Sequence, residues 1–286
     1  MSVMMAKRKY TALVLAGNRR GEKDPLAIAG NVSHKCFIDI AGEPMLRRVV
    51  RAVLESDRVH HVLVSIDADR QAEAEALLRT LKGSVRVTVL ASRESIGGSV
   101  VAAVEQIPDV LPLVITTGDN ALHTAEMVRY FCDALEDCDG DGALGLTDAE
   151  ILLKAYPDGQ RSFHRFRDGR FSSCNLYALL NGRALAAAKA FDGGGQFAKR
   201  PWRFIFSFGL PTFLLYKSRR ATLEGFLKYL SRALKVDTRP IYMPFPEGPI
   251  DVDRIADWDM ANRIVAKREN TAVPVAGPRK SQAAGG

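Results

Sequence analysis

The first half of the chain alternates short apolar runs with longer stretches in which apolar residues recur at helical spacing. The apolar runs predict buried strands at 11–16, 61–66, 85–90 and 113–117. The longer stretches predict helices at 45–55, 68–81, 98–107 and 124–135. Strands that alternate with helices of this length usually pair in parallel, so this half predicts a doubly wound α/β sheet.

The hydrophobic pattern changes near residue 150. Shorter runs predict antiparallel strands at 151–156, 162–167 and 170–179, and three consecutive glycines predict a turn at 193–195. Helical spacing returns later and predicts helices at 222–234 and 255–269. The last residues are rich in Pro, Ala, Gly and Ser, a composition typical of disordered tails.

Composition places the chain among ordinary globular proteins of basic charge. Of its 286 residues, 47% are hydrophobic and 26% are charged, and the formal net charge is +7. A basic protein favours acidic partners such as nucleotides, phosphorylated metabolites or anionic membranes. The sequence has no stacked-aromatic motif, zinc module or recognition-helix pattern, so we expect no nucleic-acid partner.

Cysteine usage and hydropathy both predict a cytoplasmic protein. The four cysteines lack the spacing of a zinc site or a disulfide framework; they are Cys36, Cys132, Cys138 and Cys174. Basic residues precede the apolar run at 11–16, but that run is too short for a signal peptide and a charged segment follows it. No run reaches the roughly 18 apolar residues that span a bilayer.

A glycine- and arginine-rich loop follows the first predicted strand. It consists of Leu15, Ala16, Gly17, Asn18, Arg19, Arg20 and Gly21. Glycine lets the backbone approach a ligand closely, and free N–H groups in such a loop hold phosphate oxygens. Arg19, Arg20 and Lys35 add positive charge, so we interpret the loop as a polyphosphate site; a plain turn with solvated arginines is the alternative. The loop has neither the Walker A nor the G-x-G-x-x-G spacing.

Acidic residues occupy two places where a metal ion would suit a phosphate ligand. Asp119 follows the apolar run 113–117 after a single glycine, and a carboxylate at a strand end facing phosphates is a natural Mg²⁺ ligand. Asp251 and Asp253 are two residues apart, so both carboxylates face one side of an extended segment. The alternative is that Asp119 or Asp253 caps a following helix.

Three other features have a functional and a structural interpretation. Asn175 is a polar residue within a predicted strand, suited either to a ligand or to a structural hydrogen bond. Gly97, Gly98 and Ser99 precede an apolar helix, where they either cap it or let a nucleobase pack against bare backbone. The basic and aromatic segment 199–235 suits an anionic acceptor or a peripheral membrane surface, unless its aromatic residues fill the core.

These motifs resemble those of the MobA-like nucleotidyltransferases, a family with a GT-A-type Rossmann-like fold. The matching segments are Leu15–Gly21, Lys35, Gly42-Glu-Pro-Met45, Gly118-Asp119 and Asp251-Val-Asp253. The resemblance implies one three-layer α/β domain at 10–268 with a mixed, mainly parallel sheet. It also implies an α+β insert at about 150–245 that binds the acceptor, leaving an N-terminal extension at 1–9 and a disordered tail at 269–286.

The resemblance further implies an enzyme that uses Mg²⁺ to transfer a nucleoside monophosphate from an NTP to a phosphorylated acceptor, with release of pyrophosphate. The acceptor would carry a sugar, alcohol or lipid head-group phosphate. The loop 15–21 would hold the base and triphosphate, with Gly97–Ser99 beside the base and Asn175 as a further ligand. Arg19, Lys35 and Asp119 would act in catalysis. Asp119 would hold Mg²⁺ together with Asp251 or Asp253.

Two rival functions fit parts of the same pattern. A glycosyltransferase of this fold would use a nucleotide sugar, although a triphosphate needs the basic loop more than a diphosphate sugar does. A non-catalytic nucleotide-binding protein would not need the set Lys35, Asp119 and Asp251. The sequence specifies neither the base, nor the acceptor, nor the oligomeric state.

Overall fold

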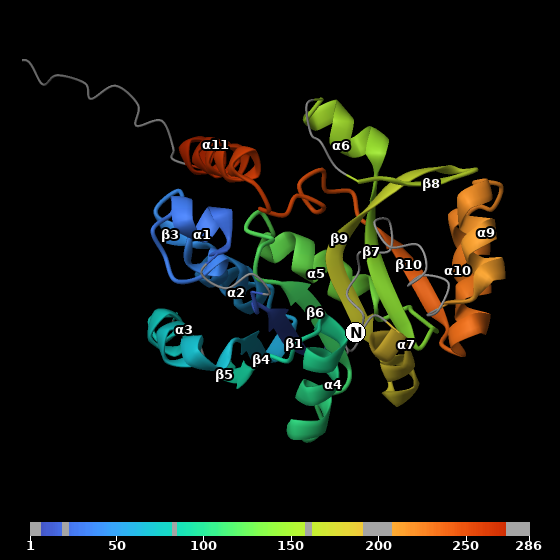
Figure 1. Ribbon diagram of the computed structural model, residues 1–286, viewed down its shortest axis with the longest axis horizontal. Helices are drawn as coiled ribbons and strands as arrows, with labels where there is room; N and C mark the ends of the chain where they lie inside the picture. Colours follow the sequence, from blue (N-terminus) through green and yellow to red (C-terminus); the bar gives the residue numbers. More distant parts are fainter. Residues whose placement is uncertain (1–6, 19–22, 82–84, 158–161, 191–207, 273–286) are drawn as a thin grey trace, which may run out of the picture.

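An eight-stranded sheet forms the centre of the molecule (Figure 1). The computed structural model describes residues 7–18, 23–81, 85–157, 162–190 and 208–272. In chain order the strands are β1 (Tyr10–Leu15), β4 (Val59–Ile66), β5 (Arg86–Ala91), β6 (Leu113–Thr117), β7 (Gly142–Asp148), β8 (His164–Phe166), β9 (Gly169–Leu179) and β10 (Thr238–Tyr242). A separate short hairpin pairs β2 (Asp39–Ile40) with β3 (Glu43–Pro44).

The sheet is mixed and mainly parallel. Its order is β10-β7-β9-β6-β1-β4-β5, and β8 pairs with β9 outside this path. Strands β6, β1, β4 and β5 run parallel to one another, whereas β9 is antiparallel to both β6 and β7. The predicted fold class, a three-layer α/β domain with a mixed sheet, is therefore confirmed.

Helices cover both faces of the sheet because each central strand is apolar on both sides. Val14 packs with α2 (Met45–Glu55), α3 (Gln71–Leu78) and α5 (Ala125–Ala134) in one core cluster. Its neighbour Leu13 points the other way, as alternate strand residues do, into a cluster with α4 (Ile96–Gln106) and α7 (Leu185–Ala190). Alternate side chains of β1 thus pack against the helices on the two faces of the sheet.

Further helices of the described residues lie outside these two layers. They are α6 (Ala149–Ala155), α9 (Leu210–Ser218), α10 (Leu223–Leu234) and α11 (Ile255–Ala272). Helix α10 packs on β10 and α9, and together they enclose an aromatic cluster against β7–β9. Helix α11 packs with α1 (Pro25–Ala29) and the segments around Ile40 and Leu122 in a further cluster.

The predicted strand at 151–156 is wrong, because this segment forms α6. Asp148 caps the helix: its carboxylate accepts a hydrogen bond from the backbone N–H of Glu150 at 2.7 Å. This cap, followed by good helix formers, outweighs the short apolar run that suggested a strand. The predicted helix at 68–81 is shorter, with α-helical geometry only over 71–78 after a 3₁₀ turn, and the last helix continues to Ala272.

Two predictions about the chain as a whole can be compared with the structure. The four cysteines are free thiols, as expected, with Cys36, Cys132 and Cys174 buried. Within the described ranges, no helix combines the length and apolar character that crossing a membrane requires. The predicted turn at 193–195 and most of the predicted tail lie outside the described residues.

Candidate active site

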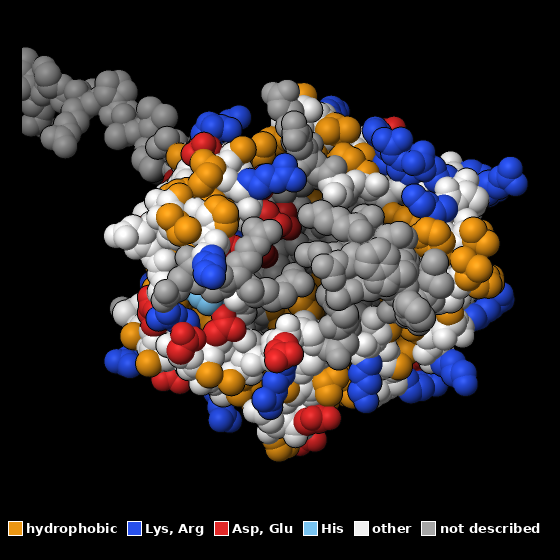
Figure 2. Space-filling model, in the orientation of Figure 1, with side chains coloured by type: hydrophobic (Ala, Val, Ile, Leu, Met, Phe, Trp, Pro, Cys, Tyr) orange, Lys and Arg blue, Asp and Glu red, His pale blue; other side chains and the backbone are white. Residues whose placement is uncertain are grey.

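The loops after four parallel strands meet at one edge of the sheet. In the register of β1, Leu15 lies opposite Ser65 of β4 and opposite Thr117 of β6. The residues that follow these strand ends line a cavity of about 1890 Å³ together with others from the C-terminal half. Ligands of doubly wound sheets bind at this edge, so the cavity is the candidate active site. Figure 2 shows acidic side chains in a hollow at the centre of this face.

Glycine is required where two of these loops touch. A Cβ on Gly118 would lie 3.1 Å from Cβ of Ala16, and a Cβ on Gly17 would lie 3.0 Å from Oγ of Ser92. The backbone N–H of Gly118 also donates to the carbonyl of Leu15 at 2.8 Å. Both glycines therefore allow close packing between neighbouring loops, which fixes the floor of the cavity.

Lys35 joins two carboxylates that come from distant parts of the chain. Its Nζ lies 2.7 Å from Oδ2 of Asp119 and 2.7 Å from Oδ1 of Asp253. Burial alone would lower the pKa of Lys35, but the charges and hydrogen bonds of Asp119 and Asp253 raise it above its ordinary value. Lys35 is therefore a fixed positive charge inside the cavity.

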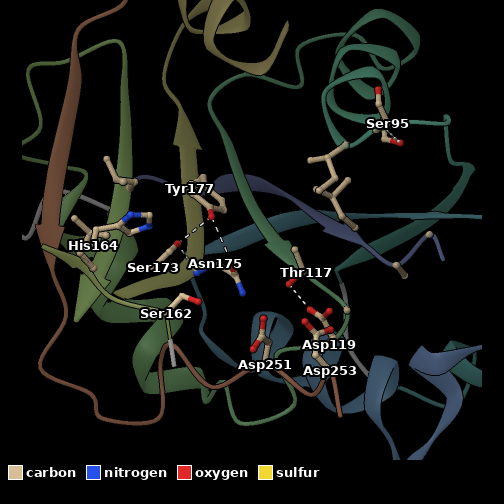
Figure 3. A pocket seen from close by; sticks show the side chains of 18 of the residues that line it. Ser95, Thr117, Asp119, Ser162, His164, Ser173, Asn175, Tyr177, Asp251 and Asp253 are labelled. Atoms are coloured by element: carbon tan, nitrogen blue, oxygen red, sulfur yellow. Dashed lines mark hydrogen bonds between the residues drawn. The ribbon is translucent and has the colours of Figure 1, made fainter. Parts of the chain in front are cut away.

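Backbone contacts place the two acidic segments beside each other. The N–H of Val252 donates to the carbonyl oxygen of Asp119 at 3.0 Å, and Oγ1 of Thr117 donates to the Asp119 carboxylate at 2.6 Å. Asp251 and Asp253 both line the cavity, and Figure 3 shows Asp119 and Asp253 together with Asp251 beside them. At the start of α11, the carboxylate of Asp257 accepts from the N–H of Arg254 at 3.0 Å and from that of Asp253 at 3.2 Å.

The donor set of this acidic cluster suits a magnesium ion bound together with phosphates. Asp119 and Asp253 already converge on one cation, and carboxylate oxygens are the hard ligands that Mg²⁺ prefers. Among the described residues, no group of three or more His, Cys, Asp or Glu side chains is arranged around one point. Mg²⁺ usually takes one or two protein carboxylates and completes its shell with phosphate oxygens and water, so two carboxylates are sufficient.

A bulge in β9 aims Asn175 at the acidic cluster. The register between β7 and β9 shifts around this residue, and Asn175 has a φ of 50°, in the left-handed region that Asn tolerates better than most residues. Its Nδ2 donates to Oδ1 of Asn120 at 3.0 Å, and its Oδ1 accepts from the hydroxyl of Tyr177 at 3.3 Å. Asn175 therefore lines the same cavity as Asp119, and its role as a ligand stays a prediction.

His123 ties together the segments that carry the site. Its Nε2 lies 2.9 Å from the carbonyl oxygen of Cys174 and 3.2 Å from that of Gly248, and it donates to them. Burial lowers the pKa of His123 to about 4, so the ring is neutral at physiological pH. It thereby fixes the β9 bulge and the loop that leads to Asp251.

Sequence reasoning missed Asp67, which organises the glycine loop. Its carboxylate accepts from the N–H of Asn18 at 3.0 Å and from Oγ of Ser92 at 2.7 Å, and lies 2.6 Å from Nε2 of His34. Burial would raise the pKa of Asp67, but these hydrogen bonds and the nearby histidine lower it below its ordinary value. The available signal was its position directly after β4, equivalent to that of Asp119 after β6.

The remaining predicted residues divide into three groups. Leu15, Ala16, Gly17, Asn18 and Ser99 line the cavity, whereas Gly97 and Gly98 lie in the first turn of α4. That turn is capped by Ser95, whose hydroxyl accepts from Gly98 N–H at 2.9 Å. Arg19, Arg20 and Gly21 lie outside the described residues. The proposed contacts of all these residues with a nucleotide stay predictions.

The basic and aromatic segment 199–235 is partly core and partly surface. Phe208 and Phe226 are buried, whereas Leu210 and Leu214 on α9 are 51% and 57% exposed. Figure 2 shows hydrophobic and basic side chains close together on the side formed by α9 and α10. Its residues up to 207 lie outside the described ranges, so membrane contact stays a prediction.

The model of the MobA-like NTP transferase domain matches residues 12–225. The chain belongs to this family. The match begins within β1 and ends in α10, so it includes the glycine loop, Lys35 and Asp119. The resemblance inferred from the motifs is therefore confirmed.

Individual proteins similar to this chain include a relative found by sequence. The chain is 30% identical over 105 residues to a 2-C-methyl-D-erythritol 4-phosphate cytidylyltransferase of Saccharopolyspora erythraea, covering 36% of this chain and 47% of that relative. The chain thus spans about half the length of the curated relative that it matches.

Solved structures share the fold at lower identity. A hypothetical transferase from Thermus thermophilus superimposes with a TM-score of 0.71 at 23% identity, covering 87% of this chain and 99% of that one. A 4-diphosphocytidyl-2C-methyl-D-erythritol synthase from Anaerococcus prevotii superimposes with a TM-score of 0.56 at 11% identity, covering 91% and 99%. At these identities the similarity concerns the fold alone.

Proposed function

We propose that the protein is an Mg²⁺-dependent nucleotidyltransferase that transfers a nucleoside monophosphate from an NTP to the phosphate of an acceptor and releases pyrophosphate. The observation that carries this proposal is the position of Lys35 between Asp119 and Asp253, in the same cavity as the first residues of the glycine loop. A cationic side chain and two carboxylates at one strand edge are what a metal-bound polyphosphate requires.

The nucleotide would lie across the ends of β1 and β6. Backbone groups of residues 15–18 and the ammonium of Lys35 would hold the triphosphate, and Arg19 and Arg20 would add charge from the same loop. Asp119 and Asp253 would hold Mg²⁺, which supplies neutralisation of the phosphate charge when bound. Ser99, with Gly97 and Gly98 behind it, would border the base.

The chemistry needs positioning and charge rather than a covalent intermediate. An oxygen of the acceptor phosphate forms a bond with the α-phosphorus, and the bond from that phosphorus to the leaving pyrophosphate oxygen breaks with its electron pair. The acceptor phosphate is already ionised near neutral pH, so no general base is required. Lys35 would offset charge on the α-phosphate, and Asn175 would orient the incoming phosphate.

The comparisons suggest where a substrate screen should begin. The relative from Saccharopolyspora erythraea is named for a cytidylyl transfer to 2-C-methyl-D-erythritol 4-phosphate. CTP and that phosphorylated alcohol are therefore the first pair to test, followed by the other nucleotides and by further sugar, alcohol and lipid head-group phosphates.

Pyrophosphate release from each of the four NTPs, with Mg²⁺ and a panel of phosphorylated acceptors, tests the proposal. We expect release with one NTP to require both acceptor and Mg²⁺, and to disappear in the Asp119→Asn variant. Transfer from a nucleotide sugar without pyrophosphate release would support a glycosyltransferase instead. Binding of an NTP without turnover across the whole panel would support a non-catalytic nucleotide-binding protein.

A further inference from the structure

The cavity has two halves of different chemistry. One half contains Lys35, Asp119 and Asp253, and the other is lined by rings and aliphatic side chains from β8, β9, α9 and α10. We call this second half the aromatic chamber and define it by Phe166, Phe171, Phe213, Tyr216, Phe226 and Leu230. A triphosphate has no use for such walls, so the chamber requires a different occupant.

Strand β9 runs from one half of the cavity to the other. Phe171, Ser173, Asn175 and Tyr177 all line the cavity, so the side chains proceed from the chamber to the phosphate end. Figure 3 shows Ser173, Asn175 and Tyr177 between His164 on one side and Asp119 on the other. One ligand lying along β9 would therefore reach from the Asp119 end of the cavity into the chamber.

The walls of the chamber support one another. The ring centroid of Phe166 lies 5.4 Å from that of Phe226 and 6.2 Å from that of Tyr216, and the rings of Tyr216 and Phe226 are 5.6 Å apart. Contacts at these distances are favourable between aromatic rings, so the walls keep their shape without a ligand. A preformed apolar wall binds an apolar group without the cost of ordering side chains.

The chamber offers little to a hydroxylated ligand. The hydroxyl of Tyr216 is paired with Nδ1 of His164 at 2.8 Å. The side chains of Phe166, Phe171, Phe213, Phe226 and Leu230 carry no hydrogen-bonding group, so a sugar packed against them would lose water from its hydroxyls without compensation there, which is unfavourable. An alkyl or isoprenoid chain would gain from leaving water at the same place.

Size and charge fit an anionic ligand that lies beside the nucleotide. The cavity volume of about 1890 Å³ exceeds the roughly 300–1,000 Å³ typical of sites for one small ligand. Arg165, Lys217 and Arg219 line it and are exposed, so cationic groups are available where an anionic acceptor would enter.

We infer that the acceptor is a phosphate monoester of an apolar chain, with its phosphate beside Asn175 and Asp119 and its chain in the aromatic chamber. This inference rests on the proposed nucleotidyl transfer and specifies its acceptor. An apolar acceptor differs from the sugar and polyol phosphates with which a substrate screen would otherwise begin.

A series of n-alkyl phosphates from butyl to octyl, below their micelle concentrations, tests the inference. Calorimetry without CTP gives acceptor affinity, because no transfer can occur there, and pyrophosphate release with CTP and Mg²⁺ gives the acceptor KM. We expect affinity to rise about two- to fourfold for each added methylene, the range expected for burial of that group. Glycerol 3-phosphate, which has a polar body, should bind more weakly than butyl phosphate.

Two tryptophan variants locate the effect. Leu230→Trp fills part of the chamber, so acceptor affinity should stop rising at a shorter alkyl chain than in the unmodified protein. Leu214→Trp lies on the exposed side of α9, so acceptor affinity should rise with chain length as in the unmodified protein. If circular dichroism shows that Leu230→Trp is unfolded, Leu230→Gln replaces it and should reduce the gain per methylene.

Affinity that does not change with chain length, equal responses of the Leu214 and Leu230 variants, or preference for glycerol 3-phosphate would overturn the inference. Absence of pyrophosphate release with every acceptor, while calorimetry still shows the chain-length dependence, would instead contradict the proposed transfer. The two failures are therefore distinguishable.

Discussion

The ammonium group of Lys35 lies 2.7 Å from a carboxylate oxygen of Asp119, across 84 residues of sequence. Asp253 lies at the same distance on another side of the ammonium group. The ammonium group of Lys35 thus pairs with carboxylates from two separate acidic segments. Under the proposed function, Mg²⁺ and the triphosphate would enter this arrangement together, so that the cation neutralises the carboxylates while Lys35 turns to the phosphates.

Asp119→Asn should reduce kcat/KM by roughly a thousandfold, because loss of a metal carboxylate removes several kcal/mol of transition-state stabilisation. Steady-state pyrophosphate release gives the rate, and circular dichroism checks the fold. Asp69→Asn, an exposed carboxylate with 71% side-chain exposure, is the matched control and should retain activity. Near-normal turnover of Asp119→Asn at saturating Mg²⁺ would contradict the metal assignment.

Lys35→Gln should weaken NTP binding by about 10- to 150-fold, since a charge-assisted hydrogen bond contributes about 1.5–3 kcal/mol. Calorimetry with each NTP and Mg²⁺ measures the loss. Lys9→Gln, which removes a half-exposed lysine from another ion pair, should leave the affinity unchanged. Equal NTP affinity of Lys35→Gln and the unmodified protein, with the rate also unchanged, would show that Lys35 does not contact the triphosphate.

Much of the first half of the fold follows from local pattern. The predicted strand 113–117 and helix 45–55 match β6 and α2 residue for residue, because each has a continuous apolar run or a clear helical face. Asp119 was found for the same reason, since a carboxylate directly after a buried strand lies at the ligand edge of a parallel sheet.

The other site features depend on contacts that sequence spacing does not encode. The Lys35–Asp253 pair spans 218 residues, and the turn of Asn175 toward the acidic cluster depends on a bulge between β7 and β9. Helix α6 was mistaken for a strand because a short apolar run was given more weight than the Asp148 cap. Asp67 had the same strand-end signal as Asp119, but its partners, Asn18 and Ser92, come from neighbouring loops.

Asp67→Ala should raise the KM for NTP with a smaller effect on the KM for acceptor. The carboxylate holds Asn18 and Ser92, so its loss releases the loop proposed to bind the triphosphate. We expect the KM for NTP to rise roughly tenfold, since a hydrogen bond to a charged group contributes about 1.5–3 kcal/mol and part of the loop keeps its other contacts. Asp67→Asn should recover part of the affinity. Equal increases in both KM values would point to general unfolding instead.

Replacement of Arg219 and Arg220 by Glu tests the predicted acceptor and membrane contact of segment 199–235. Both are exposed at the end of α9, near the exposed Leu210 and Leu214. A basic rim beside apolar side chains attracts anionic lipid, at about 1 kcal/mol for each basic residue. The double variant should bind anionic liposomes at least tenfold more weakly in flotation assays, or raise the acceptor KM, with NTP affinity unchanged. No liposome binding by the unmodified protein and an unchanged acceptor KM would remove support for either contact.

His123 should make stability depend on pH between about 4 and 6.5. Burial lowers the pKa of His123 to about 4 in the folded protein, whereas the unfolded chain takes up its proton near pH 6.5. Between these values the unfolded state binds more protons, so stability rises with pH. The contribution is complete above pH 6.5 and decreases as the pH falls, by about 3 kcal/mol at pH 4.

Urea unfolding of the unmodified protein and of His123→Gln, at intervals from pH 8 to pH 4, isolates this contribution from that of the carboxylates. The Gln amide can still donate to the carbonyls of Cys174 and Gly248 but does not titrate. Between pH 8 and pH 4, the free energy of unfolding of this variant should therefore fall by about 3 kcal/mol less than that of the unmodified protein. His60→Gln removes an exposed histidine from β4 and should leave the pH dependence unchanged. If the free energy of unfolding depends on pH in the same way for His123→Gln and the unmodified protein, His123 is not held neutral in the folded protein. Its proposed role in fixing the β9 bulge and the segment that carries Asp251 would then lose its basis.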